Sequence, residues 1–318
     1  RRALQSTFCT HSKENRDMKV LITGAGGNLG RALVPLLLEQ NHTPRLMDFR
    51  AVQTPHDFVE ADVRDFAAVQ RAVEGVDAIV HAAALHGIHL RKWAPQDFWA
   101  INVTGTFNVF EAARQQNIKR VVLCSTMGVY GESATPPPDA WGVVTEDLPC
   151  LPGDVYGMSK GLCEDMARFY SRRWGVTTVA LRLGMFVPEA SAERYGFRLL
   201  FGGVDDRDVA QAVLRSLSYQ PEDGFDFFNI MADVPFTSTD VSALQNNKRE
   251  VLERHYPELR ELLEGRQWKL DELIWGRTIW SVEKARRLLG YRPQYNFDGF
   301  LRALIAGDNE YYPVSGTP

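Results

Sequence analysis

The chain has few cysteines, no long apolar stretch and no excess of positive charge. Its four cysteines among 318 residues show neither a disulfide framework nor the paired spacing of a metal site: Cys9, Cys124, Cys150 and Cys163. Its apolar stretches are only of strand length, which is too short to span a membrane. The formal net charge is −4 and no basic run occurs, which argues against nucleic acid as a partner. We therefore expect a cytoplasmic protein without a metal centre.

The first residues also lack the apolar segment of a signal peptide. Residues 1–17 are polar and of mixed charge, and we expect them to form a tail that precedes the folded part. With 45% hydrophobic residues, the chain is large enough for one core or for a core with a smaller lobe. No internal repeat of fixed period is present.

A glycine-rich loop follows the first apolar segment. Residues 18–23 are short and β-branched, which predicts a buried strand, and residues 28–40 carry apolar side chains at helical intervals. Between them, Gly24 permits a sharp turn, Gly27 lets the backbone approach a pyrophosphate, and Gly30 allows close packing of helix on sheet. The amides at the helix start favour anions. The loop predicts dinucleotide binding, with a glycine-rich turn that binds nothing as the alternative.

An acidic residue ends the second predicted strand. Asp48 lies about 20 residues after the glycine loop, where a carboxylate can accept hydrogen bonds from the adenosine ribose and repels a 2′-phosphate. This favours NAD over NADP, although the nearby Arg50 is a side chain that a 2′-phosphate would bind. The alternative is that Asp48 only caps the end of its strand.

A tyrosine and a lysine lie one helical turn apart near the middle of the chain. The apolar spacing predicts a helix over residues 155–174, with Tyr156 and Lys160 on one face. A free phenol with a pKa near 10 is a poor base at neutral pH, and a nearby ammonium favours the phenolate. We expect Lys160 to lower the pKa of Tyr156 and to hold the nicotinamide ribose.

Two hydroxyl side chains end another predicted strand. Residues 121–126 are apolar up to Ser125 and Thr126, and the carboxyl ends of parallel strands are where ligands bind in an open α/β sheet. A hydroxyl here can bind the substrate oxygen whose proton Tyr156 removes. The alternative is a turn in which both hydroxyls bind their own backbone.

Strands and helices alternate through the first half of the chain. We expect strands near Val20, Leu46, Ala78, Val121 and Thr178, and helices near Leu33, Val69, Val109 and Met166. Such alternation predicts right-handed crossovers and a doubly wound parallel sheet of Rossmann type.

On these motifs the chain resembles the extended short-chain dehydrogenase/reductase family, in its NAD-dependent epimerase/dehydratase branch. The matching stretches are residues 18–188, 205–210 and 280–291. The resemblance implies that Thr126, Tyr156 and Lys160 are the catalytic residues. It implies a further set of cofactor contacts: Asn28, Leu29, Asp62, Val63, Ala82, Ala83, Ala84, Asn102 and Ser125, besides the three glycines, Asp48, Tyr156 and Lys160.

The departures from the family pattern bear on the substrate. Dehydratases of this branch have an acidic pair directly after the catalytic threonine, where this chain has Met127 and Gly128, so sugar dehydration is disfavoured. The stretch between Pro188 and Asp205 is shorter than in relatives that bind nucleoside diphosphate sugars, which implies a free sugar, a sugar acid or another small polyol. We expect Ser125, Thr126, Arg182 and Arg198 to contact it. The alternative is that Arg194, Arg198 and Arg207 form a diphosphate site in another way.

We expect two parts and a dimer. Residues 18–188 form the NAD-binding domain, to which residues 203–231 return, and residues 189–202 and 232–318 form a substrate-binding lobe with a charged helical run over residues 248–264. The resemblance implies a homodimer through the helices near Val109 and Met166.

The predicted activity is oxidation of a secondary hydroxyl of a sugar-like substrate. Tyr156 removes the hydroxyl proton while the hydride passes to NAD. An epimerase would use the same residues and return the hydride to the other face, so the sequence leaves both open. A non-catalytic NAD-binding regulator is a further alternative, against which the complete set of Thr126, Tyr156 and Lys160 argues.

Overall fold

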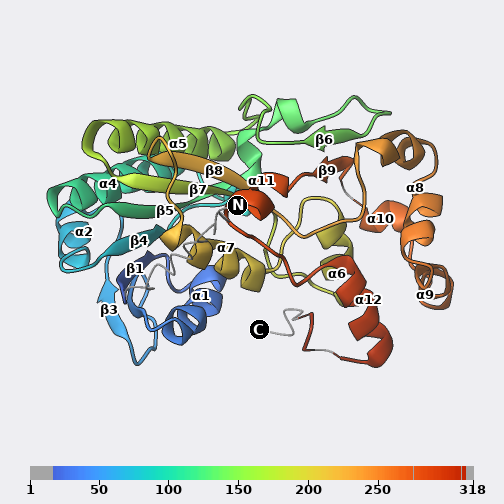
Figure 1. The fold of residues 1–318 in the computed structure, drawn as a ribbon, viewed down its shortest axis with the longest axis horizontal. Coiled ribbons are helices and arrows are strands. Elements are labelled where there is room, and N and C mark those ends of the chain that lie inside the picture. Colours follow the sequence, from blue (N-terminus) through green and yellow to red (C-terminus); the bar gives the residue numbers. More distant parts are fainter. Residues whose placement is uncertain (1–16, 275, 309, 313–318) are drawn as a thin grey trace, which may run out of the picture.

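The structure is a computed structural model that describes residues 17–274, 276–308 and 310–312. Its centre is a seven-stranded parallel sheet in the order β3-β2-β1-β4-β5-β7-β8 (Figure 1). The strands are β1 (Lys19–Thr23), β2 (Thr43–Asp48), β3 (Asp57–Glu60), β4 (Ala78–His81), β5 (Arg120–Thr126), β7 (Thr177–Leu183) and β8 (Phe225–Ile230). The predicted doubly wound Rossmann sheet is therefore confirmed.

Helices cover both faces of this sheet, and the strand residues alternate between them. The helices are α1 (Asn28–Glu39) and α7 (Asp206–Ser218) on one face, with α2 (Phe66–Ala72), α4 (Gly105–Gln115) and α5 (Val155–Trp174) on the other (Figure 1). In β1, Val20 and Ile22 pack with α1 and α7, whereas Leu21 packs with α2, α4 and α5. Because both faces are covered, β1 and β4 are buried at nearly every position.

A third apolar cluster lies beside the sheet and contains most of the C-terminal part. Its elements are α6 (Ala192–Leu200), α8 (Val241–His255), α9 (Leu259–Gly265), α10 (Leu270–Leu273) and α12 (Phe297–Ala306), on the right in Figure 1. A small sheet pairs β6 (Gly142–Val144) with β9 (Thr278–Trp280). Trp280 and Tyr291 instead pack with the α1 and α7 face, as does Ala285 of α11 (Glu283–Leu288). The exact domain boundaries stay a prediction.

The charged run predicted as one helical stretch over residues 248–264 is interrupted. Helix α8 ends at His255 and α9 begins at Leu259, with Pro257 between them. Proline disfavours helical geometry in the preceding residue, and Tyr256 has φ −132° and ψ 78°. The prediction of a continuous helix was wrong, because it followed the pattern of charged residues and did not take Pro257 into account.

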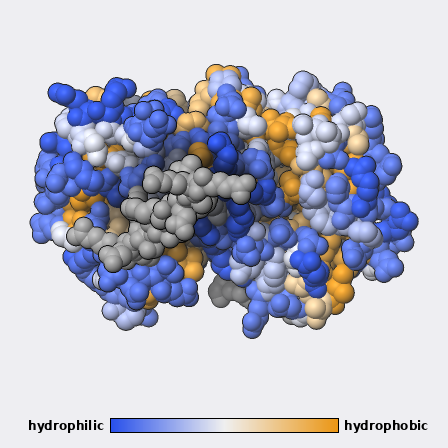
Figure 2. All heavy atoms as spheres, in the orientation of Figure 1, coloured by the Kyte–Doolittle hydropathy of each residue, from blue (hydrophilic) through white to orange (hydrophobic). Residues whose placement is uncertain are grey.

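The surface is mainly hydrophilic on the face seen in Figure 2, with a hydrophobic patch over α12. Ile305 of this helix is exposed. In the described part of the chain, no helix combines the length and apolar character needed to cross a membrane.

Candidate active site

A cavity of about 470 Å³ lies where the carboxyl ends of β1, β4, β5 and β7 meet. Residues from the glycine loop, the segment after β4, the two hydroxyls and the tyrosine–lysine pair line it: Gly24, Gly27, Asn28, Leu29, Ala82, Ser125, Thr126, Tyr156 and Lys160. Parallel strands present their carboxyl ends at one edge, so segments more than a hundred residues apart in sequence converge there. The structure thus brings the glycine loop, the two hydroxyls and the tyrosine–lysine pair together.

The glycine loop forms a close-packed cradle. Gly24 has φ +70°, and a Cβ there would lie 2.8 Å from the backbone of Ala83. A Cβ on Gly30 would lie 2.0 Å from the carbonyl oxygen of Ala25, so α1 approaches its own loop as closely as backbone allows. Gly27 precedes α1 without a side-chain cap, and no acidic residue occupies the first turn. This start of α1 fits an anionic pyrophosphate.

Asp48 holds the glycine loop through its side chain. One carboxylate oxygen accepts a hydrogen bond of 2.9 Å from the amide of Gly26, and the other accepts one of 3.1 Å from the amide of Arg50. Asp48 therefore caps the end of β2, as the alternative interpretation expected. Its contact with the adenosine ribose stays a prediction.

Four other predicted cofactor residues lie outside the lining of the cavity: Asp62, Val63, Ala83 and Ala84. Asp62 forms an ion pair of 2.6 Å with Arg64, whose hydrogen bonding lowers the pKa of Asp62 despite partial burial. Val63 is buried against Gly105, where a Cβ would come within 2.7 Å of it. Ala83 donates its amide to Thr23 Oγ1 at 3.3 Å, while the neighbouring Ala84 is half-buried. None of these four residues is among those that line the cavity.

Asn102 is buried behind the cavity. Its Oδ1 accepts a hydrogen bond of 2.8 Å from the amide of Leu85, and its Nδ2 donates to the carbonyl of Leu85 at 3.1 Å and to Ser159 Oγ at 2.9 Å. The side chain joins the loop after β4 to α5. The structure does not bring it to the cavity, because its polar atoms already bind these protein groups.

Tyr156 and Lys160 lie on the first turns of α5. Asp154 caps this helix by accepting a hydrogen bond of 2.8 Å from the amide of Gly157. Burial raises the pKa of Tyr156 to about 12, and a hydrogen bond with the Thr126 hydroxyl lowers it in part. The expected net lowering of this pKa is therefore not what the structure gives, because the loss of hydration is the largest effect on the phenol. The charge of buried Lys160 does add to burial in lowering the pKa of His81 and His86.

Ser125 and Arg182 belong to one buried network. Ser125 Oγ donates to Glu164 Oε1 at 2.6 Å, and Arg182 donates to both oxygens of Glu164, at 3.0 and 2.7 Å. The guanidinium lies between the rings of Tyr130 and Phe227 and does not line the cavity. The predicted contact of Arg182 with substrate is therefore at odds with its position, since its charge is already paired.

Arg198 supports the cavity wall from behind. Its Nη1 donates to the carbonyl of Val187, a residue that lines the cavity, and lies 3.8 Å from Glu189. Its Nε is buried without a hydrogen-bond partner among the described residues. Arg207 is paired with Asp205 at 2.7 Å, and Arg194 is exposed on α6. The structure does not gather these arginines into one diphosphate site.

Several lining residues were missed by the sequence interpretation: His86, Gly87, Ile88 and Met127. They come from loops, whose course depends on contacts elsewhere in the fold. One signal was available, because the segment with His86 directly follows the predicted cofactor segment at Ala82.

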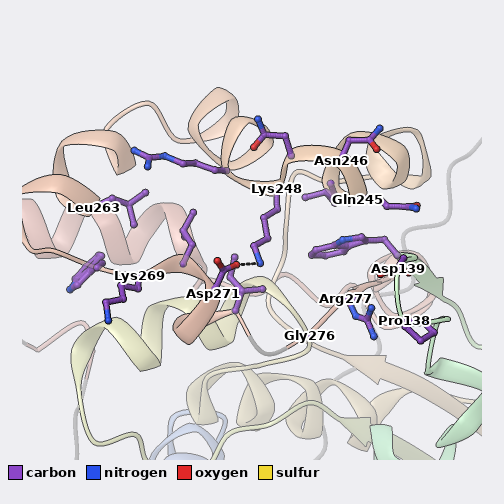
Figure 3. A pocket seen from close by; sticks show the side chains of 17 residues that line it. Pro138, Asp139, Gln245, Asn246, Lys248, Leu263, Lys269, Asp271, Gly276 and Arg277 are labelled. Carbon is purple, nitrogen blue, oxygen red and sulfur yellow. Dashed lines mark ion pairs between the residues drawn. The ribbon is translucent and has the colours of Figure 1, made fainter.

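A larger cavity of about 680 Å³ lies in the C-terminal part, between the loop at Pro138 and α8 and α10 (Figure 3). An ion pair between Lys248 and Asp271 lies beside it. None of the predicted site residues lines this cavity. The three predicted catalytic residues, Thr126, Tyr156 and Lys160, line the smaller cavity instead.

Comparison with known proteins identifies the family of the chain. The profile of the NAD dependent epimerase/dehydratase family matches residues 20–193, and the chain belongs to this family. A uronate dehydrogenase of Pseudomonas syringae pv. tomato is 29% identical over 267 residues, which cover 74% of this chain and 93% of that one. A UDP-glucose 4-epimerase of Corynebacterium glutamicum is 28% identical over 171 residues, 52% of this chain and 50% of its own length.

A solved structure is similar over nearly the whole chain. It is a short-chain dehydrogenase/reductase superfamily protein from Agrobacterium tumefaciens with bound NAD, with a TM-score of 0.66 and 25% identity, covering 92% of this chain and 97% of that one. The protein is thus an enzyme of an NAD-dependent family, and NAD is its cofactor.

Gly24→Ala tests the glycine cradle. We expect NAD affinity to fall at least about tenfold, because the added methyl meets the Ala83 backbone and φ is positive. The measurement is NAD titration by calorimetry, with circular dichroism to monitor folding. Gly161→Ala is the matched control, since a Cβ there meets nothing within 4 Å. Equal NAD affinity in both variants would contradict the cradle.

Proposed function

We propose that the protein oxidises a secondary hydroxyl of a sugar, sugar acid or similar small polyol with NAD. The observation that carries this proposal is the convergence of Thr126, Tyr156 and Lys160 with the glycine loop on one cavity. The relative named uronate dehydrogenase supports the substrate class. Screening aldoses, uronates and nucleotide sugars for NADH formation tests it.

In the proposed mechanism the chain positions the hydroxyl and moves its proton. Thr126 holds the substrate oxygen, with Ser125 beside it, and Tyr156 takes the proton from that oxygen as a phenolate. Lys160 stabilises the negative charge of the phenolate and holds the nicotinamide ribose. When bound, NAD supplies the hydride acceptor.

Net oxidation is favoured over epimerisation by the short segment after Pro188. Helix α6 occupies this segment, and its residues from Tyr195 to Leu200 are buried, mainly in the third apolar cluster. Little of the segment is left to bind a nucleotide. Stoichiometric NADH formation supports a dehydrogenase, whereas retained NAD with an inverted product identifies an epimerase.

Tyr156→Phe removes the proposed base and keeps the ring. We expect turnover to fall by about 10²- to 10⁴-fold or more with NAD affinity nearly unchanged, because only the hydroxyl is lost. Steady-state NADH formation and an NAD titration measure the two effects. Tyr170→Phe, later on the same helix, should keep its activity. Substantial activity in Tyr156→Phe would remove the base assignment.

The raised pKa of Tyr156 predicts the direction of the pH dependence. Below a pKa of about 12 the phenol is mostly protonated, so the fraction of phenolate increases with pH. We expect kcat/KM for oxidation to rise from pH 7 to pH 9, and Lys160→Met to shift this rise to higher pH. A pH–rate profile with a stable substrate measures it. A profile that is flat over this interval in both proteins would contradict the assignment.

We also propose a homodimer through α4 and α5. These helices pack on each other and leave apolar side chains exposed: Phe107 on α4, and Met158, Leu162 and Phe169 on α5. Met158 and Leu162 are four residues apart and share one face of α5. An apolar face of this kind on two adjacent helices supports a self-complementary interface.

Phe107→Glu tests this dimer. A charge placed in an apolar interface would lose its hydration there, so we expect a monomer where the wild type is a dimer. Light scattering after gel filtration measures the mass. Ile305→Glu, on the exposed side of α12, is the control and should leave the mass unchanged. A monomeric wild type, or a dimeric Phe107→Glu, would contradict the interface.

The cysteines support a proposed cytoplasmic location. Cys124, Cys150 and Cys163 are free thiols, and the first and third are buried. Free thiols are usual in a reducing compartment.

A further inference from the structure

His86 contributes an imidazole to the same cavity as Tyr156. It lies in the loop between β4 and the short turn Gly87–His89, and its ring centroid is 6.2 Å from that of Tyr156. Gly87 packs beside the phenol, since a Cβ there would lie 3.5 Å from Tyr156 Cδ1. The imidazole therefore stands beside the proposed reacting centre.

The backbone that carries His86 is fixed on both sides. Asn102 binds both the amide and the carbonyl of Leu85. His89 Nδ1 accepts a hydrogen bond of 2.8 Å from the amide of His86, and the His89 amide donates to the carbonyl of His86 at 2.9 Å. Because Asn102 also binds Ser159 of α5, the placement of His86 relative to Tyr156 is set by protein contacts.

The other polar side chains of the cavity already have partners or proposed roles. Asn28 accepts a hydrogen bond from Arg31, and Ser125 donates to Glu164. Thr126, Tyr156 and Lys160 act on the reacting hydroxyl and the cofactor. Nearby lining residues such as Ile88, Met127 and Met185 are apolar, so His86 is left to recognise a polar group of the substrate.

The imidazole is neutral at physiological pH. Burial, followed by the positive charge of Lys160, lowers the pKa of His86 to about 4. A neutral imidazole offers one hydrogen-bond donor and one acceptor, which matches a hydroxyl group.

We propose that His86 binds a second hydroxyl of the substrate and so determines which sugar is oxidised. This inference rests on the proposed function and assigns the selectivity of that site. His86 exchanges no proton with the substrate in this role; it fixes the orientation in which the reacting hydroxyl meets Tyr156 and Thr126.

The test pairs His86 variants with monodeoxy derivatives of the best substrate. With the parent sugar, we expect His86→Leu to lower kcat/KM by roughly 10- to 100-fold, because a buried hydroxyl loses its partner. One deoxy derivative should react equally slowly with wild type and His86→Leu, since the bond is absent from both. His86→Gln, which keeps a donor and an acceptor, should restore part of the activity and carries the comparison if His86→Leu does not fold.

Two controls separate recognition from a structural effect. Met185→Leu replaces one apolar side chain in the wall of the same cavity with another. It should change kcat/KM by the same factor for the parent sugar and for every deoxy derivative. NAD affinity should stay within about twofold of wild type in each variant.

The outcomes distinguish a failure of the role of His86 from a failure of the proposed oxidation of sugars. His86→Leu could lower kcat/KM by the same factor for the parent sugar and for every deoxy derivative, while the wild type oxidises the parent sugar. In that case the role of His86 is overturned and the proposed function stands. If NAD affinity falls in parallel with activity, the role is likewise overturned. If the wild type oxidises no sugar, sugar acid or polyol, both are overturned.

Discussion

The candidate site depends on one buried carboxamide. Asn102 binds the backbone of Leu85 on one side and Ser159 on the other, so it fixes the loop after β4 against α5. A buried amide that lost these partners would leave several polar groups unsatisfied, at about 1–3 kcal/mol each. This contact therefore fixes the position of the loop after β4, which borders the cofactor side of the cavity, relative to Tyr156 on α5.

A second polar chain connects the glycine loop to the same region. His81 Nδ1 lies 2.8 Å from Thr23 Oγ1, and its Nε2 lies 3.0 Å from Thr106 Oγ1. Burial lowers the pKa of His81 to about 3, so the ring stays neutral and can donate at one nitrogen and accept at the other. Arg182, which does not line the cavity, is paired with Glu164 at 2.7 Å, whereas Lys160 lines the cavity.

Local patterns sufficed to predict much of the fold and part of the site. The spacing of apolar residues located α5 at residues 155–174, and glycines between a strand and a helix located the cradle. Partners distant in sequence escaped prediction. Arg182 looked available for substrate until Glu164 was found beside it, and the pKa of Tyr156 depends on burial that spacing does not express. The loop that carries His86 has no regular period at all, so its place in the cavity follows only from the folded structure.

The most direct test of this account is a crystal structure of the protein with NAD and a substrate analogue. It should show the pyrophosphate against the amides at the start of α1, the nicotinamide ring in contact with Tyr156, and the nicotinamide ribose in contact with Lys160. A nicotinamide bound away from Tyr156, or a pyrophosphate bound elsewhere than at the glycine loop, would contradict it.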